Sequence, residues 1–287
     1  VAFTDDGDAV ANASMMQRAL QYVKMTGKAL CQHCEEPTLA ESGVMNAGPL
    51  ATRLGLAGRP AVAEELIIQR DIMLNRAIGC RYHVQHMSAE GSVELVRAAR
   101  KAGQPVTAEA TPHHLLLTED CCTGYDPVYK INPPLRTKRD QQALLKGIRD
   151  GVITMLGTDH APHTREEKEL EFAAAPSGII ALEIALPLYI EALIASGTID
   201  WPRLIAMMTI EPANLLDLPT KGRLVEGGDA DVTIIDPNES WTIDIEQFKS
   251  KSRNCPYHGR QVTGRAVTTI VGGQIKMNRV KERMGKK

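Results

Sequence analysis

The sequence lacks several features that would place it in a common functional class. Its 33 basic residues nearly balance its 35 acidic residues, giving a formal net charge of −2, and no basic cluster stands outside the last dozen residues. Nucleic acids and membrane surfaces are therefore poor candidates as partners. No apolar stretch reaches the roughly 18 residues that a membrane-spanning helix requires. We expect the basic residues of 276–287 to form a solvated tail.

Two further absences concern ligands and redox state. The glycine-rich signatures that cradle phosphates, G-x-G-x-x-G and G-x-x-x-x-G-K-[ST], do not occur, which argues against a nucleotide-binding fold. The six cysteines form no regular framework, and a chain of 287 residues does not need disulfides for stability, so we expect a reducing, cytoplasmic setting. Cys31 and Cys34 lie on either side of His33, but no second cysteine pair completes a structural zinc site.

Strand and helix patterns alternate over most of the chain. Apolar runs predict strands, and helical spacing of apolar residues predicts helices between them. The predicted strands are 1–4, 29–31, 81–86, 105–110 and 152–156, and the predicted helices are 14–26, 61–77, 92–102 and 138–149. The alternation predicts an α/β fold with a parallel sheet. Polar clusters after successive strands favour a (β/α)₈ barrel, because a barrel gathers these strand ends around one mouth.

The pattern changes after residue 218. Residues 221–228 form a turn-rich link, and β-branched runs at 230–235 and 265–271 predict strands. We expect a barrel portion over 1–218, and part of a small β-sandwich domain with a tail over 219–287, since two or three strands alone cannot close a sandwich. The chain opens at the end of a strand without a methionine, so we also expect a fragment that lacks the first strands of its barrel.

Four of the predicted strands are followed by residues suited to binding a metal ion, namely Asp6, His33, His86 and Asp159. Any one of them alone could have a structural role. An aspartate, for example, could cap a helix. Because the carboxyl ends of parallel strands converge, we expect the four side chains to share one site. Two carboxylates and two imidazoles are ligands that zinc takes in catalytic sites, where a position stays open for water.

The segments around these residues resemble those of class I dihydroorotases, in the cyclic amidohydrolase superfamily. The matching runs are Phe-Thr-Asp-Asp-Gly (3–7), Gln-His-Cys-Glu-Glu (32–36), His-Val-Gln-His-Met-Ser (83–88), Ile-Asn-Pro-Pro-Leu-Arg (131–136), Thr-Asp-His-Ala-Pro-His-Thr (158–164) and Pro-Ser-Gly (176–178). The resemblance covers nearly the whole chain and continues into residues 264–273. Alone, the Thr-Asp-His-Ala-Pro-His run would also fit hydantoinases and allantoinases.

The resemblance implies a centre of two zinc ions at the barrel mouth. Asp6 would bridge both ions, at the place where most of the superfamily uses a carboxylated lysine. His33 and His86 would hold the more buried ion. Asp159 would contact the other ion and act as the catalytic base. The residues implied to contact the substrate are Asn132, His163, Ser177 and Gly178.

The implied reaction is the reversible, zinc-dependent hydrolysis of (S)-dihydroorotate to N-carbamoyl-L-aspartate, a step of pyrimidine biosynthesis. A hydantoinase or allantoinase of the same fold is one alternative, and Asp6 in place of the modified lysine favours the dihydroorotase. Another alternative is a catalytically inactive dihydroorotase-like subunit that serves as a scaffold. The implied partners are the small-molecule substrate, further copies of the chain, and aspartate transcarbamoylase.

One part of the family pattern does not occur in this sequence. Members of the family carry a His-x-His pair for the second metal and, closely after it, an arginine for the substrate carboxylate, and no such pair precedes Asp6. The second ion would then keep only Asp6 and Asp159, which is too few protein ligands for tight binding. We therefore expect the chain as given to bind at most one zinc ion tightly, on the side of the histidines.

We expect structural or supporting roles for several other polar residues. His83 precedes His86 by an odd number of residues in a predicted strand, so we expect its side chain on the opposite face, in the core. We expect the histidines at 113–114 either in a loop or behind the residues that bind the metal, and His258 in a turn. The glutamates at 35–36 are candidates to orient a metal-binding histidine.

Overall fold

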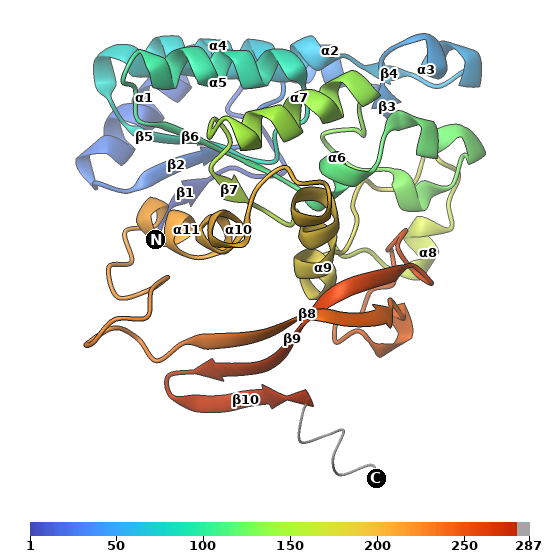
Figure 1. Cartoon of the computed structure of the whole chain (residues 1–287). Helices are drawn as coiled ribbons and strands as arrows, with labels where there is room; N and C mark the ends of the chain where they lie inside the picture. The colour runs from blue at the N-terminus through green and yellow to red at the C-terminus, as the bar shows by residue number, and fades with distance from the viewer. Residues whose placement is uncertain (280–287) are drawn as a thin grey trace.

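The computed structural model describes residues 1–279 of the chain. Its larger part is built on a five-stranded sheet (Figure 1). In spatial order the strands are β1 (Phe3–Thr4), β2 (Ala29–Gln32), β5 (Arg81–Val84), β6 (Val106–Ala110) and β7 (Met155–Leu156). Each neighbouring pair is parallel, so the predicted parallel α/β sheet is confirmed. The spatial order follows the order along the chain, as it does in a (β/α)₈ barrel.

Four long helices cover one face of this sheet (Figure 1). They are α1 (Ala13–Met25), α4 (Ala61–Ile78), α5 (Glu90–Lys101) and α7 (Lys138–Arg149). Each helix has apolar residues at helical spacing, and these pack in one core, whose members include Leu20, Ile68, Val93 and Leu144 of the helices and Tyr82 of β5. Full burial of each such aliphatic side chain contributes roughly 1.5–3 kcal/mol, so this helical layer holds the strands in place.

Strand β5 shows which of its residues face the core. Tyr82 and Val84 are fully buried within the apolar cluster under the helices. His83 therefore lies on the other face of the sheet, where its Nδ1 is 2.8 Å from Thr107 Oγ1 and its Nε2 is 3.3 Å from Glu109 Oε2. His83 is buried, as predicted for a core position, but it lies outside the apolar cluster, which Tyr82 and Val84 of this strand occupy.

The C-terminal part of the described chain forms a second sheet. Its strands β8 (Val232–Thr242), β9 (Gln261–Val271) and β10 (Gln274–Asn278) are antiparallel, in the order β10-β9-β8. An apolar cluster joins this part to the larger one, with Ile180, Ile184, Leu188, Ile243, Tyr257 and Val262 among its members. The predicted strand 230–235 overlaps β8 and the predicted strand 265–271 lies within β9, whereas β10 was missed. The division of the chain at residue 218 stays a prediction.

The remaining elements are short. They are α2 (Pro37–Ala40), β3 (Met45–Asn46), α3 (Pro49–Leu54), β4 (Gly58–Arg59), α6 (Pro112–Leu116), α8 (Arg165–Lys168), α9 (Ala185–Tyr189), α10 (Trp201–Met208), α11 (Ile210–Leu215), the 3₁₀ helices Glu119–Gly124, Pro127–Tyr129, Leu182–Ile184 and Ile245–Gln247, and the π-helical turn Ile190–Ala195. Strands β3 and β4 pair in parallel. Most of these elements connect the carboxyl ends of the main strands to the next helix, which is where a barrel carries its functional loops.

Two sequence expectations concern the chain as a whole. None of the helices within residues 1–279 is both long enough and apolar enough to cross a lipid bilayer. All six cysteines are free thiols, in agreement with the expectation of no disulfide framework. Residues 276–278 of the predicted tail lie in strand β10, so the tail prediction was wrong there, and residues 280–287 lie outside the described residues.

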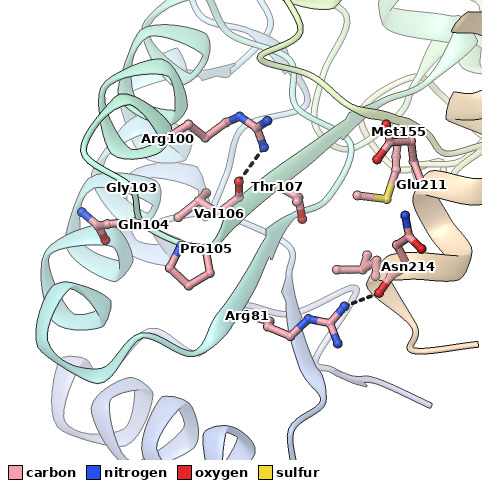
Figure 2. A pocket seen from close by; sticks show the side chains of 11 residues that line it. Arg81, Arg100, Gly103, Gln104, Pro105, Val106, Thr107, Met155, Glu211 and Asn214 are labelled. Carbon is pink, nitrogen blue, oxygen red and sulfur yellow. Dashed lines mark hydrogen bonds between the residues drawn. The ribbon is translucent and has the colours of Figure 1, made fainter.

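A cavity of about 340 Å³ lies at the amino ends of β5 and β6 (Figure 2). The two guanidinium groups beside it are held by backbone carbonyls: Arg100 donates to Val106 O at 2.9 Å, and Arg81 donates to Asn214 O. The residues predicted to carry out chemistry follow the carboxyl ends of the strands, at the opposite edge of the sheet. This cavity is therefore not the predicted site.

Candidate metal centre

Three of the predicted metal ligands meet at the carboxyl edge of the sheet. Asp6 follows β1, His33 follows β2, and His86 follows β5. His86 Nε2 lies 3.0 Å from His33 Nδ1 and 3.2 Å from Asp6 Oδ1, and the remaining separation, Asp6 Oδ1 to His33 Nδ1, is 3.8 Å. Parallel pairing of the three strands thus brings together residues up to 80 positions apart in the sequence.

The spacing of these three atoms suits a single small cation. In a tetrahedral site with zinc–ligand bonds of about 2.0–2.1 Å, the ligand atoms lie about 3.3 Å from one another. The observed separations of 3.0, 3.2 and 3.8 Å lie around this value. Both histidines are buried, whereas the Asp6 side chain is 41% exposed, so the group is open toward solvent on the side of Asp6.

The hydrogen bonding of the histidines also fits a cation. His86 Nε2 faces both Asp6 Oδ1 and His33 Nδ1, so without a cation one N–H must be shared between two acceptors. Nδ1 of His86 is buried with no hydrogen-bond partner in the described chain. A metal ion among the three ligand atoms would take a lone pair from each of them in place of this shared hydrogen bond.

Negative charge surrounds the two imidazoles. Burial alone would lower the pKa of His86, but the hydrogen bond to Asp6 and the nearby carboxylates of Asp159 and Glu109 raise it to about 9. The hydrogen bond with His86 lowers the pKa of Asp6. Such an arrangement stabilises positive charge at this point, whether it is brought by a proton or by a metal ion.

The charge of Asp159 raises the pKa of His86, but Asp159 lies outside the group formed by Asp6, His33 and His86. Burial raises the pKa of Asp159, while the charges of His86 and His33 act in the opposite direction. Within residues 1–279, the group whose ligand atoms all lie within 4.8 Å of one another contains Asp6, His33 and His86. The role of Asp159 as a second-metal ligand and base stays a prediction.

His86 and Asp159 share an uncommon backbone conformation. Their φ angles are +29° and +44°, and only four non-glycine residues in the described chain have positive φ. Such conformations are unfavourable for residues with a Cβ and persist where the surrounding structure enforces them, often at functional sites. At His86 the backbone N–H donates to Glu109 Oε1 at 3.3 Å, which helps to hold the turn after the strand.

Asn132 and Glu35 lie on the far side of His33. Asn132 Nδ2 is 3.2 Å from His33 Nε2 and 3.2 Å from Glu35 Oε2. Asn132 Oδ1 is buried with no hydrogen-bond partner in residues 1–279. Glu35 Oε2 lies 3.7 Å from His33 Nε2, whereas Glu36 caps α2 by accepting from Leu39 N at 2.9 Å, so Glu35 is the glutamate that can orient His33.

Electrostatics keep Glu35 ionised beside His33. Burial would raise the pKa of Glu35, but the hydrogen bond to His33 and the charge of Arg59, whose Nη1 donates at 3.0 Å, lower it. An ionised Glu35 carboxylate favours a proton on His33 Nε2, which leaves Nδ1, facing Asp6 and His86, free to bind a cation, whereas the donating amide of Asn132 favours an unprotonated Nε2.

The other predicted substrate contacts form a second group. His163 Nε2 donates to Ser177 O at 2.8 Å. Gly178 has φ of +153°, and a Cβ there would stand 2.8 Å from both Ala161 Cβ and His163 Cδ2. The loop after β7 and the loop at 176–178 are therefore in direct contact, and that contact requires glycine at position 178.

The two adjacent histidines at 113 and 114 lie in the short helix α6, so the loop alternative was wrong, and the supporting role stays a prediction. Burial lowers the pKa of each to about 3, so both are neutral. His114 Nε2 donates to Pro133 O at 3.0 Å, which supports the segment that carries Asn132. The helix had a sequence signal, since Thr111 and Pro112 are a favourable N-cap and first helical residue.

Sequence reasoning missed a second support of that segment, the buried cation Arg136. Its side chain donates to Ser88 Oγ at 3.1 Å, to Asn46 Oδ1 at 2.8 Å and to Arg59 O at 2.6 Å. Ser88 follows the turn at His86, so Arg136 links the segment of Asn132 to the metal-ligand turn. The sequence signal that could have identified Arg136 was its position directly after an apolar and proline-rich run.

Comparisons with known proteins agree with this arrangement. A model of the "Amidohydrolase family" matches residues 1–276. A curated "Dihydroorotase" of Pelotomaculum thermopropionicum is 47% identical over 277 residues, covering 96% of this chain and 65% of that protein. Another "Dihydroorotase", of Streptomyces coelicolor, is 45% identical over 273 residues, covering 95% of this chain and 64% of that protein. The chain thus spans less than two thirds of the length of these relatives.

Solved structures show the same fold. An L-hydantoinase from Arthrobacter aurescens is 31% identical with a TM-score of 0.86, over 97% of this chain and 63% of that one. A D-hydantoinase from Thermus sp. is 27% identical with a TM-score of 0.80, over 96% of this chain and 61% of that one. Since the family match extends from residue 1 to residue 276 and the metal-ligand cluster lies within it, the chain belongs to the amidohydrolase family.

Proposed function

We propose that this protein is a dihydroorotase, which opens and closes the ring of (S)-dihydroorotate, with N-carbamoyl-L-aspartate as the open form, in pyrimidine biosynthesis. The observation that carries the proposal is the cluster of Asp6, His33 and His86 at the carboxyl edge of the sheet. A carboxylate with two imidazoles supports metal-dependent hydrolysis, and curated relatives named dihydroorotase support the choice of substrate.

The metal we propose is zinc, with two ions in a complete active site. Asp6, His33 and His86 would hold one ion, and Asp6 and Asp159 would contribute to holding the other. Bound zinc supplies a Lewis acid and lowers the pKa of water toward neutrality, so that hydroxide is available near pH 7.

Asp159 is the proposed general base. The attacking water adds its oxygen to the ring amide carbonyl, and its proton passes to the Asp159 carboxylate. The same carboxyl returns the proton to the ring nitrogen as the carbon–nitrogen bond breaks. Burial raises the pKa of Asp159, which suits a group that must both accept and release a proton.

The proposed substrate contacts are Asn132, His163, Ser177 and Gly178. Asn132 Oδ1 has no hydrogen-bond partner in the described chain and lies beside His33, so it can accept a hydrogen bond from a ring N–H of the substrate. His163 and the backbone of the 176–178 loop form a second polar surface, held together by the bond from His163 to Ser177. Both groups offer hydrogen-bonding atoms for the polar ring of the proposed substrate.

A hydantoinase is the second candidate, because the solved relatives named above are hydantoinases. Asp6 favours the dihydroorotase, since the resemblance gives most of the superfamily a modified lysine at that position. The intact cluster argues against an inactive scaffold. We also propose a cytoplasmic location, from the free cysteines, and association with further copies or with aspartate transcarbamoylase.

The test is a side-by-side assay of dihydroorotate, hydantoin and allantoin with the zinc-loaded protein at its natural length. We expect turnover of dihydroorotate, and a loss of kcat of about 10²–10⁴-fold in Asp159→Asn. Asp150→Asn, which changes an exposed carboxylate, is the matched control and should retain full activity. Turnover of hydantoin or allantoin without dihydroorotate would contradict the proposal.

A further inference from the structure

Asn254 makes an unusually complete set of contacts with the loops at the mouth of the site. It lies between the 3₁₀ helix Ile245–Gln247 and β9, and only 5% of it is exposed. Its Nδ2 donates to Ala161 O at 2.9 Å and to Gly178 O at 3.0 Å, and its Oδ1 accepts from His163 N at 3.3 Å. One side chain from the C-terminal part therefore joins both substrate-side loops.

These contacts define the orientation of the amide. If its oxygen and nitrogen were exchanged, Oδ1 would face two carbonyl oxygens and Nδ2 would face an N–H group, leaving all three contacts unfavourable. The backbone takes part as well, because Asn254 O accepts from Ile180 N at 3.1 Å. No residue other than asparagine offers two donors and one acceptor on so short a side chain.

Asn254 is itself firmly anchored. Its neighbours Cys255 and Tyr257 are 4% and 1% exposed, and both belong to the apolar cluster that joins the two parts of the chain. Ile180 and Leu188 of the larger part pack in the same cluster. The position of Asn254 is thus set in part by apolar packing of Cys255 and Tyr257, which lie outside the two loops that its side chain contacts.

The two loops need such a connection because they touch closely. Gly178 lies against Ala161 and His163 with no room for a Cβ. Lys168, at the end of α8 in the segment after β7, donates from Nζ to Pro176 O at 3.0 Å and to Gly178 O at 3.2 Å, and Ala161 N donates to Ile179 O at 3.1 Å. The side chain of Asn254 adds a bridge between the two loops and supplies the acceptor for the backbone N–H of His163.

We propose that Asn254 is a positioning residue, contributed by the C-terminal part, which sets the distance between His163 and the Ser177–Gly178 backbone for substrate binding. The inference rests on the proposed function, which assigns substrate contacts to these two loops. The side-chain hydrogen bonds of Asn254 in the described chain go to the loops and none goes to Asp6, His33 or His86. Loss of the amide should therefore weaken substrate binding and leave metal binding intact.

The experiment compares Asn254→Ala and Asn254→Asp with the exposed control Asn238→Ala in the natural-length protein. Hydrogen exchange measured by mass spectrometry, zinc content, and kinetics with dihydroorotate are recorded for each. Asn254→Asp keeps the size of the side chain but turns a carboxylate oxygen toward Ala161 O and Gly178 O, so it removes the bridge without creating a cavity.

For both variants we expect faster exchange confined to residues 160–164 and 176–181. We expect unchanged zinc content, and a KM for dihydroorotate raised about tenfold with a smaller change in kcat. Asn238→Ala should match the unmodified protein in every measurement.

Two results would overturn the inference. One is unchanged exchange in both loops of both variants. The other is faster exchange spread evenly over the sheet together with loss of zinc, which would make Asn254 a general structural residue. Inactivity of the unmodified protein toward dihydroorotate would instead count against the proposed function, and the exchange pattern, which needs no substrate, would still decide whether Asn254 positions the loops.

Discussion

At the scale of single residues, the adjacent residues Asp5 and Asp6 differ in whether they belong to the candidate metal centre. Asp6 Oδ1 lies 3.2 Å from His86 Nε2, whereas the neighbouring Asp5 is exposed and lies outside the cluster. Asp6→Asn should weaken zinc binding by more than about 100-fold, because it replaces a charged ligand with a neutral amide. Asp5→Asn is the matched control and should bind zinc normally. Competition with a chromophoric chelator measures both affinities, and equal affinities would refute the assignment of Asp6.

Two buried histidines should make the folded state sensitive to acid. Burial lowers the pKa of His113 and of His114 to about 3, while an unfolded histidine has a pKa of about 6.5. Between these two values the unfolded chain binds protons that the folded chain does not. The free energy of unfolding must then fall as pH falls through this window, by up to about 1.4 kcal/mol per pH unit for each histidine.

His113→Phe tests this linkage. It keeps an aromatic ring stacked against Tyr257 but removes one of the two titrating groups. Urea unfolding at pH 7, 6 and 5 should show a shallower decline in stability for the variant than for the unmodified protein. Parallel declines would mean that His113 is not responsible for the acid sensitivity.

The residues of the candidate metal centre could be predicted because they follow strands that the sequence itself predicts. His33 and His86 follow apolar runs, and parallel strands bring such positions together. The partners of His83 could not be predicted. Alternation along a strand shows that neighbouring residues lie on opposite faces of the sheet, but it does not show which face carries Thr107 and Glu109. That choice is made by the packing of Tyr82 and Val84 under the helices.

At the scale of elements, one carboxylate connects the starts of two helices. Asp140 Oδ2 accepts from Thr137 N at 3.2 Å in the capping box of α7, and Asp140 Oδ1 accepts from Glu90 N at 3.0 Å at the start of α5. Asp140→Ala should lower the free energy of unfolding by about 1–2 kcal/mol, and Thr137→Ala by about 1 kcal/mol, because only the former affects both helices.

Urea titration measures both losses. Glu94→Ala, an exposed substitution on α5, is the control and should change stability by less than about 0.5 kcal/mol. If Asp140→Ala is no more destabilising than Thr137→Ala, then Asp140 does not stabilise α5.

At this scale, elements with a long periodic pattern in the sequence were predicted, and very short elements were not. Helix α7 lies where its amphipathic spacing placed it, from Lys138 to Arg149. The two-residue strands β3 and β4 have no periodicity to detect, and they are fixed by distant contacts, such as the bond from Asn46 to Glu119 Oε2 at 2.5 Å. Elements that exist because of tertiary contacts cannot be read from local sequence.

At the scale of the whole molecule, metal binding and folding should be coupled. The three ligands come from the ends of three strands, so an ion among them joins β1, β2 and β5 in the folded state alone. Zinc at about 1,000 times its dissociation constant should then stabilise the fold by about 4 kcal/mol. Thermal melting with and without a chelator measures this stabilisation.

The same melting experiment with His33→Ala provides the control, since that variant keeps the strands but loses one ligand. Its melting temperature should no longer respond to the chelator. An equal response in both proteins would show that the stabilising ion is bound elsewhere.

The parallel sheet could be predicted at this scale, and the link between the two parts of the chain could not. Asn254 bonds to Gly178 across 76 positions of sequence, and no periodic pattern relates the two. Contacts of this kind follow from how the apolar cluster around Tyr257 places the C-terminal part against the loops.

The central claim is that Asp6, His33 and His86 bind a catalytic metal ion, and anomalous X-ray diffraction at the zinc absorption edge, from crystals grown with zinc, tests it most directly. The account predicts an anomalous peak about 2.0–2.1 Å from Asp6 Oδ1, His33 Nδ1 and His86 Nε2. The absence of a peak among these three atoms, or a peak on the thiols of Cys31 and Cys34 instead, would contradict it.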